Sequence, residues 1–175
     1  SCPFTCLAAP SPELPHPLVN SADLVRPPLL ITQEKLDETL HRLTGDDVAA
    51  FVGFTPQLVV AEQFIPNAYA RGDNSIVLTR GLLETLASDD ELAFVLAHEL
   101  GHLMLHHRTM VSHRLLGADT PAEPIKRELE ADRFALELLT RSGYAARAAP
   151  SFLQRLGAWG QELGSPLRDF HPSIS

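Results

Sequence analysis

The chain has 175 residues, of which 45% are hydrophobic and 21% are charged, and its formal net charge is −8 at pH 7. This length allows a substantial core but not two full-sized domains, and the apolar content excludes disorder along the whole chain. The negative charge argues against nucleic acid or an anionic lipid surface as the main partner. No run of about 18 apolar residues is free of charges and helix breakers, so we predict no transmembrane segment.

Prolines are frequent in the first thirty residues and predict an extended arm over residues 1–30, followed by one domain over residues 31–175. The two cysteines of the chain, Cys2 and Cys6, both lie in this arm. They either close a small disulfide loop, which would indicate an oxidising compartment, or remain reduced thiols. Cys2 is also compatible with a lipid-modified mature N-terminus, although the lipobox that would precede it is not visible in the sequence.

An amphipathic helix is predicted over residues 33–43. Thr32 is its expected N-cap, and Leu36, Leu40 and Leu43 fall on one side of it. The glycine and two aspartates that follow at positions 45–47 are expected to end the helix.

Two strands are predicted next, at the β-branched run 58–60 and at the apolar run that follows the turn residues 71–74. The second strand comes just before a long apolar segment, residues 92–105. It is either an edge strand, to which an extended peptide could add through backbone hydrogen bonds, or a buried internal strand. Its residues are Ser75, Ile76, Val77 and Leu78.

The segment VLAHELGHLML carries the strongest chemical signal. A capping box at residues 88–91 predicts the start of a helix that runs to about His107. On that helix His98 and His102 share one face, so both imidazoles can reach one ion. Zinc held by two imidazoles and a carboxylate keeps an open position for a water whose pKa falls to roughly 7, and the neighbouring Glu99 can accept its proton. The alternatives are a chance match or two histidines packed in the core.

A second helix is predicted between a start signal at residues 120–123 and a stop signal at Gly143. Glu128 and Asp132 are four residues apart and share a face. We interpret Glu128 as the third metal ligand and Asp132 as the acceptor that holds the second nitrogen of a ligand histidine. Glu130 lies off this face and is expected to face solvent. The alternative is a solvated charged stripe on a surface helix.

HELGH followed by ELEAD resembles the gluzincin metallopeptidases of the HtpX and CAAX-prenyl-protease type, metallopeptidase family forty-eight. The resemblance covers roughly residues 57–175 and extends to the segments around Asn67, SIVLTRGLL, Gly143-Tyr144 and His171-Pro172. It implies an α+β, zincin-like domain with a short sheet, an active-site helix and a glutamate helix. It also implies one Zn²⁺ per chain, and it favours the edge-strand interpretation of residues 75–78.

A further helix is predicted from about Ala146 to Leu163. His171 lies beyond it, and three roles remain open for this histidine. It could be a fourth zinc ligand that displaces the water and makes the enzyme latent, a donor to the oxyanion, or an ordinary loop histidine. Tyr144 and Arg168 are further candidate oxyanion donors.

The resulting hypothesis is a zinc-dependent endopeptidase that hydrolyses peptide bonds of unfolded or misfolded proteins in a bacterial periplasm or cell envelope. The alternative is a non-proteolytic binding or chaperone module that contains zinc for structure. The resemblance departs from the family in lacking membrane-spanning helices. Because such domains often continue beyond the point where this chain stops, a further C-terminal partner region is expected.

Overall fold

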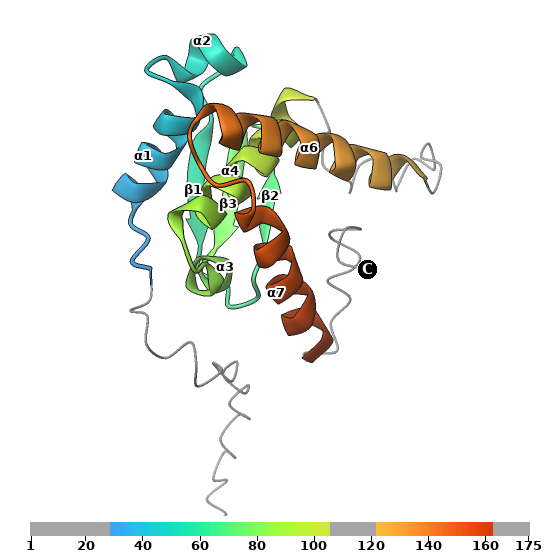
Figure 1. Cartoon of the computed structure of the whole chain (residues 1–175). Helices are drawn as coiled ribbons and strands as arrows, with labels where there is room; N and C mark the ends of the chain where they lie inside the picture. The colour runs from blue at the N-terminus through green and yellow to red at the C-terminus, as the bar shows by residue number, and fades with distance from the viewer. Residues whose placement is uncertain (1–28, 106–121, 163–175) are drawn as a thin grey trace, which may run out of the picture.

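The structure, a computed structural model, describes residues 29–105 and 122–162 (Figure 1). These residues combine helices with a three-stranded sheet, which is the predicted α+β class and is compatible with a zincin-like domain. None of the helices in these two ranges is long and apolar enough to cross a membrane. The elements are α1 (Gln33–Thr44), α2 (Val48–Val52), β1 (Gln57–Ala61), β2 (Ala68–Ala70), β3 (Ser75–Thr79), α3 (Arg80–Thr85), α4 (Asp89–Met104), α6 (Ala122–Arg141) and α7 (Ala148–Glu162).

The sheet has the strand order β1-β3-β2, with β1 parallel and β2 antiparallel to β3. The prediction that Ser75, Ile76, Val77 and Leu78 form an edge strand is therefore wrong, because β3 is the central strand and all of its residues are buried. Its continuous apolar run, rather than an alternating one, is what burial on both faces requires. In the described sheet the edges belong to β1 and β2.

Helix α4 occupies the centre of the molecule and packs against α1, α6, α7 and the strands β2 and β3 (Figure 1). Every residue from Glu91 to Gly101 is buried. The helix is apolar on all sides, and such a helix is stable only when other elements surround it. The two histidines and the glutamate of HELGH are therefore held inside the protein by the most enclosed helix of the described fold.

Helix α1 agrees with its prediction. The Thr32 side chain accepts a hydrogen bond from the backbone N–H of Lys35, and Leu36, Leu40 and Leu43 are buried. The short helices α2 and α3 were not predicted, because five or six residues are too few to show a helical period. Their N-caps, Asp47 and Thr79, are the local signals that mark them.

The three acidic residues in the first turn of α4 each contact a different segment of the chain. Asp89 forms an ion pair with Lys35 of α1, at 2.6 Å, and Asp90 accepts a hydrogen bond from the Ala145 N–H at 2.9 Å. Glu91 forms an ion pair with Arg155 of α7. The capping box differs from its prediction in one detail, because the Glu91 carboxylate accepts from the N–H of Ala87 and not from that of Ser88.

Helix α6 lies across α4 and turns its small residues toward it. Ala131 and Ala135 are fully buried, whereas Leu129 and Leu136 are 56% and 38% exposed. Small side chains allow two helix backbones to approach closely, so the alanines and not these leucines form the contact face. Gly143 ends the helix with φ 73°, as its stop signal predicted.

Gly81 in α3 lies directly against the backbone of the loop that follows β1. A Cβ atom at this position would lie 1.9 Å from the backbone oxygen of Phe64. Because that neighbour is backbone, Gly81→Ala should lower the free energy of unfolding by about 1–3 kcal/mol. Gly72→Ala is the control, since its Cβ would meet nothing within 4 Å. Urea unfolding followed by circular dichroism would test this, and equal midpoints for the two variants would contradict it.

Candidate metal centre

The two histidines of HELGH lie on successive turns of α4 and face each other, as predicted. The Nε2 atoms of His98 and His102 are 3.0 Å apart, and their ring planes are 79° from parallel. Both side chains are largely buried, at 8% and 13% exposure. Their ring nitrogens are therefore directed toward one common point and away from bulk solvent.

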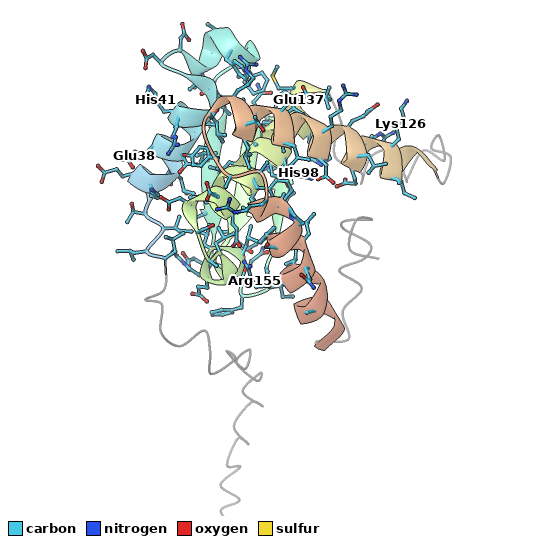
Figure 2. All side chains as sticks on the ribbon, in the orientation of Figure 1. Glu38, His41, His98, Lys126, Glu137 and Arg155 are labelled. Carbon is cyan, nitrogen blue, oxygen red and sulfur yellow. The ribbon has the colours of Figure 1, made fainter. Side chains whose placement is uncertain are left out.

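Glu128 reaches the same point from α6, where that helix crosses α4 near His98 (Figure 2). One carboxylate oxygen is 3.4 Å from the Nε2 of His98, and the other is 3.5 Å from the Nε2 of His102. One ligand atom from each of the three residues lies within 4.8 Å of the other two. Two separate helices thus contribute to one cluster that could hold a metal ion.

The spacing of this cluster fits a zinc ion. Zinc ligands lie about 2.0–2.1 Å from the ion in a tetrahedral arrangement, so two ligand atoms should be roughly 3.3 Å apart. The Nε2 atoms of His98 and His102 are 3.0 Å apart, and each of them lies 3.4 or 3.5 Å from a different oxygen of Glu128, which is near this value. Two imidazoles and one carboxylate are also a donor set suited to zinc.

Asp132 holds His98 from the opposite side of the ring. Its Oδ1 is 3.0 Å from the Nδ1 of His98. When this nitrogen carries the proton and donates a hydrogen bond to the carboxylate, the Nε2 lone pair points at the cluster. The structure thus contains the predicted contact of Asp132 with one of the two histidines, and its role at a metal ion stays a prediction.

The electrostatics of the cluster favour positive charge at its centre. Burial opposes ionisation of His98, but its hydrogen bonds to Asp132 and Glu128 outweigh burial and raise the pKa of His98 to about 10. Burial likewise opposes the charge of Glu128, but hydrogen bonds from His102 and His98 lower the pKa of Glu128 to about 2. A cation and a proton compete for the same Nε2 lone pair, so these carboxylates would also stabilise a metal ion.

Glu99 lies beside this cluster and is only 7% exposed. It is close enough to His98 to contribute to the raised pKa of that ring. The hydrogen bonds that join the described residues include none to the Glu99 carboxylate. A buried carboxylate without such bonds is costly to fold, which is typical of a group kept for chemistry.

The remaining residues singled out in the sequence lie away from this cluster or outside the described residues. Glu130 is exposed, as expected. Tyr144 is buried at the far end of α6 beneath the Arg42 guanidinium, whose carbon is 4.0 Å from the ring centroid, and this position does not support an oxyanion role. His171, Arg168 and the cysteines Cys2 and Cys6 lie outside the described residues, so the roles given to them stay predictions.

Gly101 is the residue of this site that the sequence analysis missed. A Cβ atom there would lie 3.1 Å from a ring carbon of Phe134 and 3.3 Å from the Cα of Ala131. This glycine, together with the alanine opposite, lets α4 and α6 approach until Glu128 reaches the histidines. The sequence did contain a signal for this residue. A glycine inside a helix is less favourable than alanine by about 1 kcal/mol, so its presence there indicates a packing requirement.

Comparison with known families agrees with this geometry. The model of peptidase family M48 matches residues 31–119, which is just over half of the chain. The chain belongs to peptidase family M48. The model named Peptidase U49 also matches, over residues 89–158, a range that contains both α4 and α6.

Similar curated proteins carry protease names. The chain is 29% identical over 162 residues to a mitochondrial metalloendopeptidase OMA1 of Arabidopsis thaliana, which covers 79% of this chain and 33% of that protein. It is 28% identical over 181 residues to a beta-barrel assembly-enhancing protease of Yersinia pestis, with 83% and 36% covered. A protease HtpX homolog of Aeropyrum pernix is 43% identical over 60 residues, with 32% and 18% covered. The chain thus spans about a third of the length of the first two relatives.

The contact between Asp132 and His98 can be tested by removing the carboxylate. Asp132→Ala should weaken Zn²⁺ binding by about 10–100-fold without abolishing it, because His98 would lose the group that fixes its ring. Glu130→Ala removes an exposed carboxylate from the same helix and is the matched control. Competition with a chelator would measure both affinities, and equal values for the two variants would contradict this role.

Proposed function

We propose that this chain is the catalytic domain of a zinc-dependent endopeptidase. The observation that supports it is the cluster of His98, His102 and Glu128 beside the buried Glu99. The histidines and Glu128 are proposed as the ligands of one Zn²⁺. When bound, zinc would polarise the scissile carbonyl and lower the pKa of a water to about 7.

The residues around the cluster then have distinct roles. Glu99 would accept a proton from the attacking water and deliver it to the leaving amine. Asp132 would keep the Nδ1 proton of His98 in place, so that the Nε2 of this ring stays a ligand. A site that held zinc only for structure would not require a buried, unbonded carboxylate at position 99. This difference favours the peptidase over the non-proteolytic alternative.

The edge of β2 that pairs with no other strand among the described residues is the proposed binding surface for the substrate main chain. β2 packs against α4, and its partner β3 occupies only one of its sides. Two backbone hydrogen bonds lie at the ends of the strand: the Thr79 N–H donates to the Asn67 carbonyl, and the Arg71 N–H donates to the Ser75 carbonyl. In the antiparallel alternation, the N–H and C=O groups of Ala68 and Ala70 therefore face away from β3. A peptide that pairs with them must be extended, which favours unfolded or misfolded proteins as substrates.

A bacterial envelope is the proposed setting, with quality control of envelope proteins as the role. The support comes from relatives in Yersinia pestis and Vibrio cholerae that are named beta-barrel assembly-enhancing proteases, the second as a putative one. Because the chain spans about a third of these relatives, the partners of the whole protein are part of the same proposal. Latency through His171 remains a separate hypothesis.

Substituting Glu99 would separate metal binding from chemistry. Glu99→Gln keeps the shape of the side chain but cannot accept the proton, so zinc content should be unchanged and casein cleavage should fall by at least about 10²-fold. Elemental analysis and a casein assay on the same preparation would measure both. Cleavage at the wild-type rate would contradict the general-base role, and a wild type that binds zinc without cleaving any unfolded substrate would favour the non-proteolytic module.

Proline at the edge of β2 would test how the substrate binds. Ala70→Pro removes an N–H that faces away from β3, so it should leave the sheet intact and remove one hydrogen bond to an extended substrate. We expect KM for unfolded peptides to rise about fivefold to tenfold, in line with a net contribution of about 1 kcal/mol for one hydrogen bond. Zinc content and thermal midpoint are the controls. An unchanged KM would place the substrate elsewhere.

A further inference from the structure

His98 contacts an aromatic side chain in addition to Asp132. Phe94 lies one turn earlier on α4, and the centroids of the two rings are 6.0 Å apart with a tilt of 52°. On its other side Phe94 meets Phe152 of α7, with centroids 6.3 Å apart in an edge-to-face arrangement. Phe94 is 2% exposed and Phe152 is 4% exposed. Phe152, Phe94 and His98 thus form an aromatic row that leads from α7 to the metal centre.

The far end of this aromatic row is fixed by charge. Arg155, one turn after Phe152 on α7, forms an ion pair with Glu91, one turn before Phe94 on α4. The Glu91 side chain is only 5% exposed, so the pair is screened little by solvent on that side. The ion pair and the contact between Phe94 and Phe152 therefore hold the same two helices together at successive turns.

A hydrogen bond runs from the Nδ1 of His98 to the carboxylate of Asp132, at 3.0 Å. It holds one edge of the ring but allows the ring to tilt about that contact, and tilting would move the Nε2 atom away from His102 and Glu128. A buried ring packed against His98 opposes this tilt. We propose that Phe94 and Phe152 are positioning residues for His98, so that α7 sets the affinity of the metal centre through the aromatic row. This inference rests on the proposed metal-binding role of His98.

A double-mutant cycle on Zn²⁺ affinity tests the inference. Phe94→Leu and Phe152→Leu keep apolar side chains in the core but remove the rings. Each variant should weaken Zn²⁺ binding by about fivefold to tenfold, which is near the low end of the effects known for groups that support a metal ligand. Because both act through one contact to His98, the double variant should be no weaker than the stronger single variant. Chelator competition on the folded full chain would measure the four dissociation constants.

Two further variants separate positioning from general loss of stability. Leu36→Ala empties part of the core on α1, outside the aromatic row, and should lower the unfolding midpoint while leaving Zn²⁺ affinity unchanged. Arg155→Met loosens α7 without touching a ring. It should weaken Zn²⁺ binding about threefold in the wild-type background and have no effect when Phe94 is already leucine.

The geometry of the site gives a readout that does not depend on activity. Co²⁺ bound in place of Zn²⁺ has visible absorption bands that depend on the arrangement of its ligands, and these bands should shift in Phe152→Leu but not in Leu36→Ala. Multiplicative losses of affinity in the cycle, or unchanged bands, would overturn the positioning role while the proposed function stands. Absence of Zn²⁺ binding by the wild type would overturn both.

Discussion

The distance between α4 and α6 is the constraint on which the rest of the site depends. The candidate ligands come from both helices, and a zinc ion tolerates deviations of only about 0.2 Å in its bond lengths. Gly101 meets Ala131 where the helices cross, and neither residue has a side chain that would hold the backbones apart. The crossing thus brings Glu128 to within 3.4 and 3.5 Å of the two histidines without a long, mobile side chain between them.

Contacts far from the cluster keep this crossing in place. Arg42 of α1 donates hydrogen bonds to the carbonyls of Ser142 and Gly143, directly after the end of α6. Asp90, at the start of α4, accepts a hydrogen bond from Ala145 in the turn that follows. The end of α6 is therefore tied to α1 and to the beginning of α4, and the close contact at Gly101 fixes a second point along the pair. Two fixed points determine how one helix lies on another.

The sequence predicted the parts of the fold that repeat a period or that carry a chemical motif. Leu36, Leu40 and Leu43 show a helical period, and α1 matches it almost residue for residue. The same-face spacing indicated that His98 and His102 project from one side of their helix, and Glu128 and Asp132 from one side of theirs. In the structure these two sides lie against each other. The position of β3 could not be read in this way, because strand order depends on pairing between distant residues, and a run such as Ile76 to Leu78 fits both an internal and an edge strand. The exposure of Leu129 was likewise decided by packing, since the alanines beside it allow a closer approach to α4.

The metal centre is assembled at a cost to folding that the surrounding structure must offset. Three carboxylates, those of Glu99, Glu128 and Asp132, lie around the buried His98 and the half-buried His102, and each loses solvation when the chain folds. Ion pairs with a protonated His98 offset part of this cost for Glu128 and Asp132, and a bound cation would do the same with a larger charge. Glu99 is different, because the described residues offer its carboxylate no hydrogen bond. Its burial is what the proposed general-base role would require, since a carboxylate that accepts no hydrogen bond from the described residues could take up a proton.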